Sequence, residues 1–187
     1  MKTITGKSVN LRSYKLDDAR SIYEWWNDDE TTKWMGRKFR ESQEYQVIEE
    51  RLRGIIENPP EDALFYAIAS KGTDLYIGGI DLTSIDLVDK NAILSVVIGK
   101  RQDRSKGYGS EAVGLILKTV FSELELHKVE LNVRDRNAAA ICCYKKMGFV
   151  EEGRRKDHAF INGSFNDIIH MLVFSAEFKS LFSQQPD

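Results

Sequence analysis

Arg104-Ser105-Lys106-Gly107-Tyr108-Gly109 separates an apolar run, residues 92–98, from a helical pattern, residues 110–124. A strand, a loop rich in glycine and cations, and a helix, in this order, can offer backbone N–H groups to a phosphorylated ligand. Glycine lets the main chain approach the ligand's oxygens, and the first turn of a helix has unpaired N–H groups and a partial positive charge. The sequence therefore predicts a pyrophosphate-binding unit over residues 92–125.

Hydrophobic periodicity on both sides of this unit predicts the other helices and strands. The expected strands are 9–12, 63–70, 75–86, 92–98, 129–133, 150–161 and 165–174. The expected helices are 17–27, 42–56, 110–125 and 137–147. The order βααβββαβαββ indicates one mixed α/β domain of the α+β class over residues 1–187, with residues 183–187 as a flexible tail.

Residue types at the element boundaries support this assignment. Asp17 or Asp18 can cap the first helix, and Asn137 can cap the last. Asn162-Gly163 is a preferred two-residue hairpin turn. Gly78-Gly79 lies inside an expected strand and indicates a bulge or a close backbone approach.

Two expected helices have an apolar face for covering a sheet. In the helix over 42–56 this face comprises Val47, Ile48, Leu52, Ile55 and Ile56. In the helix over 110–125 it comprises Ala112, Val113, Ile116, Leu117, Val120, Phe121 and Leu124. Both helices are therefore expected to pack on the core.

Composition places the chain among compact globular proteins of one domain. It has 187 residues, of which 42% are hydrophobic and 30% charged, and its formal net charge is −2. Nucleic-acid binding depends largely on neutralising phosphates, so this charge argues against a nucleic-acid partner. A small anionic cofactor remains compatible, because only its own site must be basic.

The sequence predicts a cytoplasmic protein without a metal. Met1 to Thr5 leads directly into polar sequence, and no apolar run reaches the length of a membrane span. Cys142 and Cys143 are adjacent, so they offer neither a disulfide framework nor a zinc spacing. The three histidines also have no paired metal spacing.

Three interpretations of the glycine loop compete before any family is considered. A nucleoside triphosphate loop needs Gly-x-x-x-x-Gly-Lys-Ser/Thr, which does not occur around Lys106. Gly107, Gly109 and Ala112 satisfy the dinucleotide pattern Gly-x-Gly-x-x-Ala, but about eight residues separate them from the strand end near Gly99, where that pattern requires almost none. A simple turn is the third interpretation.

The chain resembles the GNAT acetyltransferase superfamily, in which Arg/Gln-x-x-Gly-x-Gly/Ala binds acetyl-coenzyme A; Arg104, Gly107 and Gly109 match this signature. Other segments agree in order and spacing: residues 96–99, residues 137–149, and the closing hairpin with Asp167 and Met171. The similarity covers residues 9–174. The chain looks most like the branch of ribosomal-protein N-terminal acetyltransferases and spermidine acetyltransferases.

The resemblance implies a mostly antiparallel sheet flanked by helices, with one splayed parallel strand pair. It implies acetyl-CoA as co-substrate, with the acyl-pantetheine arm inserted at the splay. The residues it assigns to the cofactor are Val96, Val97, Ile98, Arg104, Ser105, Lys106, Gly107, Tyr108, Gly109, Ser110, Asn137, Ala140 and Tyr144. Main-chain amides of residues 104–110 would hold the pyrophosphate, and the Arg104 and Lys106 side chains would add charge.

Tyr144 has two possible roles. Asn137, Ala140 and Tyr144 fall on one face of their expected helix. Tyr144 is either a core residue or, by resemblance, the general acid that protonates the leaving thiolate. A phenol with a pKa of about 10 can protonate a thiolate whose acid has a pKa of about 8.5.

The residues that bind the acceptor amine are less clearly marked. Candidate bases are Asp28, Asp29 and Glu30 after the first helix and Asp167 in the last strand, and Trp25 and Trp34 add aromatic faces. Aromatic and acidic side chains suit a cationic amine. A polyamine, a protein or peptide N-terminus, an amino sugar and an aminoglycoside all satisfy these features, and the enzyme is expected to be a monomer or a homodimer.

The chain departs from the branch at two positions. Ile93 and Ser95 stand where relatives often have Glu and Gly. A non-catalytic acyl-CoA-binding regulatory module therefore remains an alternative to an N-acetyltransferase. A dinucleotide-dependent oxidoreductase is the third possibility.

Overall fold

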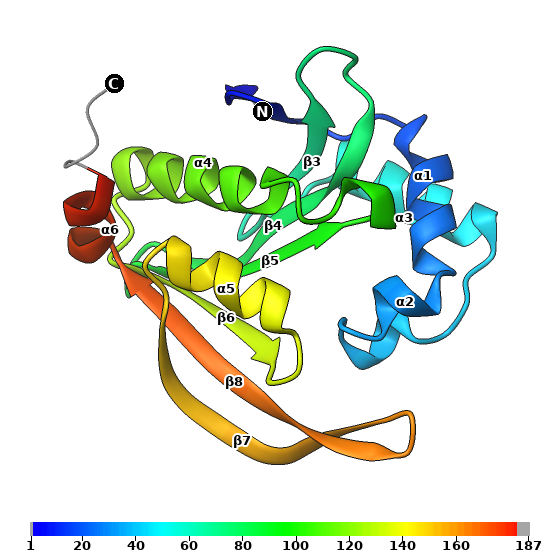
Figure 1. Ribbon diagram of the computed structural model, residues 1–187. Helices are drawn as coiled ribbons and strands as arrows, with labels where there is room; N and C mark the ends of the chain where they lie inside the picture. The colour runs from blue at the N-terminus through cyan, green and yellow to red at the C-terminus, as the bar shows by residue number, and fades with distance from the viewer. Residues whose placement is uncertain (1, 183–187) are drawn as a thin grey trace.

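The computed structural model describes residues 2–182, in which eight strands form one sheet in the order β1-β2-β3-β4-β5-β6-β8-β7 (Figure 1). The strands are β1 (Ile4–Thr5), β2 (Val9–Arg12), β3 (Leu64–Ser70), β4 (Tyr76–Asp86), β5 (Asn91–Ile98), β6 (Lys128–Arg134), β7 (Val150–Ile161) and β8 (Ser164–Phe174). Neighbouring strands are antiparallel except β5 and β6. The predicted mixed architecture is confirmed, and the predicted tail 183–187 lies outside the described residues.

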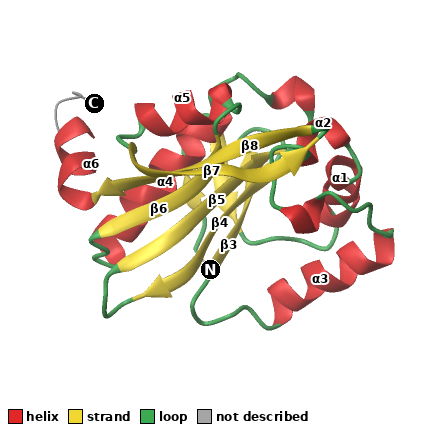
Figure 2. Ribbon diagram, turned by 90° about the horizontal axis from the view of Figure 1, so that it is seen from below, coloured by secondary structure: helices red, strands yellow, loops and turns green. Residues whose placement is uncertain are grey.

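Helices cover both faces of the sheet (Figures 1 and 2). They are α1 (Asp18–Trp26), α2 (Asp29–Thr32), α3 (Tyr45–Glu57), α4 (Tyr108–Glu123), α5 (Ala138–Lys146) and α6 (Ser175–Phe182), with short 3₁₀ turns η1 (Arg37–Phe39) and η2 (Arg101–Asp103). Along β5, Val96 and Ile98 pack on the core under α4 and α5, whereas Val97 packs on a second cluster with α1 and α3. Alternate residues of a strand point to opposite faces, so the two cores lie on opposite sides of the sheet.

The helices next to the glycine loop form as the sequence predicts. The apolar stripe of α4, from Ala112 to Phe121, is buried against the sheet. The Asn137 side chain caps α5 by accepting a hydrogen bond from the Ala140 amide at 3.2 Å. Gly148 follows the end of α5 with φ +89°, a conformation that favours glycine. These boundaries fix α4 and α5 beside each other on one face.

The parallel pair β5–β6 separates after three residue pairs. Asn91 pairs with Lys128, Ala92 with Val129 and Ile93 with Glu130. Residues 94–98 of β5 continue to pair with β4, as far as Ile98 opposite Gly78. The second half of β5 is therefore bonded on one side only, which confirms the predicted splay.

Two glycine-dependent features in the strands are also confirmed. The β3–β4 register shifts next to Gly78, and a Cβ at Gly78 would lie 2.0 Å from the Val97 carbonyl oxygen. In the β7–β8 hairpin, Asn162 and Gly163 have φ values of +47° and +76°. Positive φ at both central residues defines the type I′ turn that matches the twist of paired strands.

The predicted cap of α1 is wrong. Asp17 makes no capping hydrogen bond, and Asp18 lies inside the helix. The Asp18 carboxylate instead binds the Arg12 guanidinium through two hydrogen bonds of 2.8 and 2.9 Å and accepts the Lys15 amide. A buried arginine offers this carboxylate a stronger partner than a helix N–H group.

The helix predicted over 42–56 is shifted and less buried than expected. It begins at Tyr45, and only Ile48 and Leu52 are buried, while Val47 and Ile56 are 48% and 40% exposed. The helix is buried through these two residues only, so the rest of its predicted apolar face remains partly or fully exposed. The sequence interpretation also missed β1, α2 and α6: β1 has two residues and α2 four polar ones, while α6 buries Phe178.

Candidate active site

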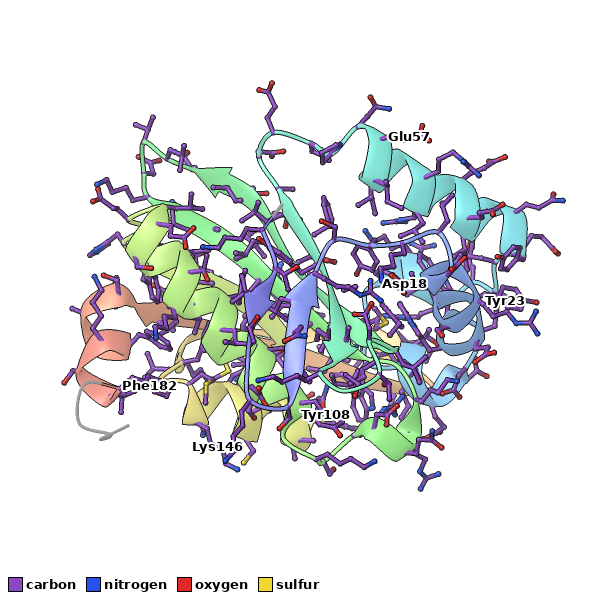
Figure 3. All side chains as sticks on the ribbon, turned by 90° about the horizontal axis from the view of Figure 1, so that it is seen from above. Asp18, Tyr23, Glu57, Tyr108, Lys146 and Phe182 are labelled. Atoms are coloured by element: carbon purple, nitrogen blue, oxygen red, sulfur yellow. The ribbon has the colours of Figure 1, made fainter. Side chains whose placement is uncertain are left out.

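The loop between β5 and α4 presents open main-chain donors at the start of a long helix. Gly107 has φ +86° and precedes the first residue of α4, Tyr108, which Figure 3 labels where the loop enters the helix. The first hydrogen bond of this helix runs from the Glu111 amide to the Gly107 carbonyl at 2.9 Å. The amides of Tyr108, Gly109 and Ser110 precede it, so they have no partner within the helix. These donors and the helix dipole suit an anion.

The Arg104 side chain is directed away from this donor group. Its guanidinium donates to the Gly99 carbonyl at 2.7 Å, to the Ile98 carbonyl at 3.3 Å and to the Thr31 hydroxyl. The Arg104 amide donates to the Arg101 carbonyl at 3.2 Å. Arg104 therefore ties the loop to the end of β5 and to α2, and its predicted amide contact with pyrophosphate is not supported.

Lys106 and Ser105 lie at the surface of the loop. Both residues are exposed, and Ser105 has φ +60°. The Lys106 ammonium lies 3.7 Å from the Asp103 carboxylate, an exposed contact that is weak in water. Lys106 is thus the cation of this loop that remains available to a phosphate.

The splay presents the edge of β5 to an extended ligand. Beyond Ile93, the main chain of Val96, Val97 and Ile98 lies in the part of β5 that pairs only with β4. An unpaired strand edge is a ready site for an added strand-like group. The loop donors and this edge are adjacent in the chain, so one elongated ligand can bind to both.

Tyr144 is buried in the core on the face of the sheet that α4 and α5 cover. Its side chain is 6% exposed, its ring centroid lies 5.7 Å from that of Phe149, and it belongs to the same core cluster that Val96 and Ile98 contact. Burial raises the pKa of Tyr144 above its ordinary value of 10. The phenol is therefore protonated at neutral pH, as both a core residue and a proton donor require.

A contact that the sequence interpretation missed links α4 to α5. The Ser110 hydroxyl donates to the Cys143 sulfur at 3.2 Å. Burial raises the pKa of Cys143, so its thiol remains protonated. This contact holds the start of α4 against the helix that carries Tyr144.

Trp25 and Trp34 do not form a common aromatic site. Trp25 is 6% exposed and stacks on Trp26 with ring centroids 5.8 Å apart. A Cβ at Gly99 would lie 2.7 Å from Trp25, so this indole supports the end of β5 as a core residue. Trp34 is partly exposed, with the Lys33 ammonium 5.3 Å from its ring centroid.

The acidic residues predicted near the acceptor have structural partners. Asp28 caps α2 by accepting from the Glu30 amide at 3.2 Å and the Thr31 hydroxyl at 2.5 Å. Glu30 pairs with Lys33 at 2.6 Å, and Asp29 is exposed at the start of α2. These contacts account for two of the three carboxylates without a role as base.

Asp167 also has structural partners, in the β7–β8 hairpin. The Asp157 amide donates to its carboxylate at 2.9 Å, and Arg154 pairs with it at 3.2 Å. These two contacts lower the pKa of Asp167. A carboxylate held in its ionised form by donors is a poor proton acceptor, so Asp167 does not suit the role of base.

Asp81 is the carboxylate with the properties of a base, and the sequence interpretation missed it. It lies on β4 opposite Ser95 of β5, and its Oδ1 is fully buried without a hydrogen-bond partner among residues 2–182. Burial raises the pKa of Asp81 to about 7, although Arg51 and Lys38 act in the opposite direction. The sequence signal was one acid within the apolar run of residues 77–82.

Two partly buried phenols lie close to Asp81. The ring centroids of Tyr14 and Tyr76 are 6.2 Å apart. A Cβ at Gly79 would lie 2.3 Å from the Tyr14 hydroxyl and 3.6 Å from that of Tyr76, so only glycine leaves room for them. Burial raises both pKa values, and the Asp81 charge adds to the effect. Both phenols therefore stay protonated beside the base.

Within residues 2–182, no helix combines the length and the hydropathy that crossing a membrane requires. The same part of the chain brings together no cluster of three or more His, Cys, Asp or Glu side chains suited to holding a metal ion.

Known proteins share this arrangement. A family model described as "Acetyltransferase (GNAT) domain" matches residues 8–150. A spermidine N(1)-acetyltransferase of Vibrio cholerae is 28% identical over 171 residues, which cover 91% of this chain and 95% of the relative. A putative ribosomal N-acetyltransferase of Bacillus subtilis is 28% identical over 102 residues, which cover 54% of this chain and 55% of the relative. These matches confirm the predicted resemblance and its branch.

A solved structure agrees with the sequence relatives. The crystal structure of spermidine N-acetyltransferase from Vibrio cholerae in complex with CoA and spermine superposes with a TM-score of 0.79 at 25% identity. The match covers 91% of this chain and 98% of that one. The likeness therefore extends over most of the chain.

Proposed function

The chain belongs to the GNAT acetyltransferase family and is an N-acetyltransferase, and we propose that it transfers the acetyl group of acetyl-CoA to a primary amine by direct attack on the thioester. The observation that carries this proposal is the separation of β5 from β6 beside the open N-terminus of α4. It offers donors for a diphosphate and an edge for an extended arm in one continuous site.

The residues present fit acetyl-CoA. The amides of Tyr108, Gly109 and Ser110 would bind the diphosphate, with Lys106 adding charge. Hydrogen bonds to a charged group contribute about 1.5–3 kcal/mol each, so three can anchor the cofactor without an extensive basic surface. The main chain of residues 96–98 would bind the pantetheine amides and orient the thioester carbonyl toward the acceptor.

Asp81 is the proposed general base. An amine of ordinary pKa about 10.4 must lose a proton before it attacks, which costs about 4.6 kcal/mol at pH 7. A carboxylate whose pKa is about 7 accepts that proton more readily than an ordinary aspartate, and a base poised near the working pH is the most effective. Relatives often have a Glu where this chain has Ile93. Asp81 pairs with Ser95, two residues further along β5, and so supplies a carboxylate near the position of the missing Glu.

Tyr144 is the proposed general acid. When the amine nitrogen bonds to the carbonyl carbon, the C–S bond breaks and the sulfur leaves with its electron pair. The Tyr144 hydroxyl, kept protonated by burial, donates its proton to that sulfur. The ammonium loses one proton to Asp81 before the attack, and the nitrogen loses a second proton when the amide forms. The second proton restores the Tyr144 phenol, and Asp81 returns the first to solvent, so the transfer releases one proton overall.

The relatives leave several acceptor classes open. A polyamine agrees with the spermidine acetyltransferases and a peptide N-terminus with the ribosomal relative. An amino sugar or an aminoglycoside is also a primary amine of suitable size. A cytoplasmic enzyme acting as a monomer or a homodimer, without a metal, is part of the same proposal.

Thiol release from acetyl-CoA tests the function directly. The purified protein is incubated with acetyl-CoA and one amine at a time, from a panel of polyamines, aminoglycosides, amino sugars and short peptides. Release that depends on an amine supports the transferase. Acetyl-CoA binding without release across the panel would favour the acyl-CoA-binding regulatory module.

A thermal-shift measurement separates the oxidoreductase alternative. A ligand that binds only the folded state raises the unfolding temperature, and the stabilisation grows with the logarithm of its concentration relative to its Kd. We expect stabilisation by acetyl-CoA and none by NAD or NADP. The reverse result would support the dinucleotide interpretation.

A further inference from the structure

Arg134, the last residue of β6, is a buried cation with unused donors. It is 4% exposed, and its Nη2 donates to the Met35 carbonyl in the segment between α2 and η1. Its Nε and Nη1 are buried and have no hydrogen-bond partner within residues 2–182. Burial lowers the pKa of Arg134, and the charge of Arg40 acts in the same direction.

Three further cations surround this position and Asp81. Arg40 acts electrostatically on Arg134, and its Nη1 donates to the Phe160 carbonyl at 2.9 Å. Lys38 and Arg51 both act electrostatically on Asp81, and burial together with the charge of Arg51 lowers the pKa of Lys38. We call Lys38, Arg40, Arg51 and Arg134 the cationic cluster.

Arg134 lies on the same sheet face as the proposed base. Asp81 pairs with Ser95, and two residues earlier along β5 Ile93 pairs with Glu130 of β6. Arg134 follows Glu130 by four residues, and side chains two and four apart on a strand share a face. Asp81 on β4 and Arg134 on β6 therefore face the same side of the sheet, with the splayed half of β5 between their strands.

An uncompensated cation is costly in this position. A buried charge needs a partner, and within residues 2–182 no ion pair joins any member of the cationic cluster to a carboxylate. The free Nε and Nη1 of Arg134 retain two donors of the planar fork that binds carboxylates and phosphates. An anionic group on the substrate would supply the partner that the Arg134 donors lack.

We propose that the acceptor is a small primary amine that also carries an anionic group, a carboxylate or a phosphate, and that Arg134 binds this group with Lys38 and Arg40. The inference rests on the proposed function and specifies its substrate. Asp81 receives the amine, and the cationic cluster receives the anion.

The same charges disfavour a polyamine. Spermidine carries only cationic groups, so beyond the amine at Asp81 its remaining charges would face the cationic cluster. The acids that could compensate, Asp28 and Glu30, are held at α2 by Thr31 and Lys33. Discrimination against polyamines thus follows from repulsion as well as from lost attraction.

Matched amine pairs test the proposal. Ethanolamine and O-phosphoethanolamine differ by a phosphate, whereas 1,5-diaminopentane and lysine differ by a carboxylate; spermidine is measured alongside. We expect kcat/KM at least tenfold higher for the anionic member of one pair or both, and the two pairs separate phosphate from carboxylate. Spermidine or the unsubstituted amines reacting at least as fast would overturn this inference and leave the proposed function standing. No thiol release with any amine would overturn both.

Variants connect the preference to the cluster. Arg134→Gln should raise KM for the preferred anionic amine at least tenfold and leave KM for acetyl-CoA within twofold, whereas Arg134→Lys should retain part of the preference. Lys38→Gln, at an exposed position, should weaken the preference without affecting the fold. Arg53→Gln, an exposed arginine on the same helix as Arg51, is the matched control and should change nothing. An unchanged preference in both Arg134→Gln and Lys38→Gln would contradict the proposal.

A measurement without turnover gives a second readout. We expect the preferred anionic amine to raise the unfolding temperature of the wild type and of Arg53→Gln, but to have less than half that effect on Arg134→Gln. If the amine stabilised Arg134→Gln as much as Arg53→Gln, the anion would bind elsewhere and the proposed role of Arg134 would be contradicted.

Discussion

At the scale of single residues, the strongest chemical asymmetry of the site is between two acids whose pKa values are both raised. Burial raises the pKa of the Asp81 carboxyl to about 7 and that of the Tyr144 phenol above 10, so at neutral pH Asp81 can accept a proton while Tyr144 can only donate one. Groups whose environments separate their pKa values in this way are suited to acid and base roles.

Replacing Asp81 should reduce activity and change its pH dependence. General bases contribute about 10²- to 10⁴-fold, so Asp81→Asn should lower kcat/KM by about 100-fold or more. In the wild type, kcat/KM should rise with pH through a group titrating near 7, and this step should disappear in the variant. A retained step at pH 7 would assign the base to another group.

The same substitution should stabilise the fold at alkaline pH. The pKa of Asp81 is raised above its ordinary value of 3.8, so the folded state binds the proton more tightly than the unfolded state and stability falls as pH rises from about 4 to 7. Asp81→Asn should therefore increase the free energy of unfolding by up to about 4 kcal/mol at pH 8, and by clearly less at pH 5. Urea denaturation at the two pH values measures the difference.

Tyr144→Phe tests the proposed acid. The phenylalanine keeps the packing against Phe149, so the acetyl-CoA affinity should remain within about twofold. Loss of the donor should lower kcat by about 10- to 100-fold or more. An unchanged kcat would leave Tyr144 as a core residue only.

Which residues the sequence could identify depended on the type of signal. The loop residues 105–110 and Tyr144 lie within motifs whose spacing is visible in the chain. Asp81, Tyr14 and Tyr76 meet only when β4 and the segment before α1 pack together, and the value of Asp81 as a base comes from its burial. Trp25 could not be assigned from the sequence, because an aromatic residue next to acids looks the same in sequence whether it lies in the core or at the surface.

At the scale of elements, the entrance to α4 depends on one backbone conformation. Gly107 has φ +86°, which residues with a Cβ adopt only at a cost of about 1 kcal/mol, although no atom lies within 4 Å of a Cβ built there. The strain, and not a clash, is therefore what a substitution would introduce.

Gly107→Ala should weaken acetyl-CoA binding about 5- to 10-fold, because relief of the strain turns the neighbouring amides away from the diphosphate. Isothermal titration calorimetry measures the affinity. Gly72→Ala, in a distant open turn without positive φ, is the control and should bind normally. Equal affinities in the two variants would show that the loop tolerates a Cβ at position 107.

The elements that could be predicted are those whose signals are local. Periodicity placed α4, the cap at Asn137 placed α5, and Asn162-Gly163 placed the last hairpin. α2 was missed because its four residues carry no apolar period and are stabilised by the Asp28 cap and by contacts with Arg104. The cap of α1 was misassigned because Asp18 binds Arg12, six residues earlier in the chain.

At the scale of the whole molecule, acetyl-CoA should act on the sheet as well as on the loop. We expect its binding to slow amide hydrogen exchange in residues 94–98 and 105–110, since the ligand covers the β5 edge and the α4 donors. The β7–β8 hairpin, whose strands pair with each other over most of their length, should exchange as before. Protection spread evenly over the sheet, or confined to another region, would contradict the proposed position of the ligand.

The splay should affect how fast the protein is degraded in the cell. Three residue pairs are the whole ladder between the β1–β5 half of the sheet and the β6–β8 half. The unloaded enzyme should therefore open along this seam more often than the loaded one, and open chains are what proteases degrade. Its abundance would then follow the supply of acetyl-CoA, falling under carbon starvation without any change in synthesis.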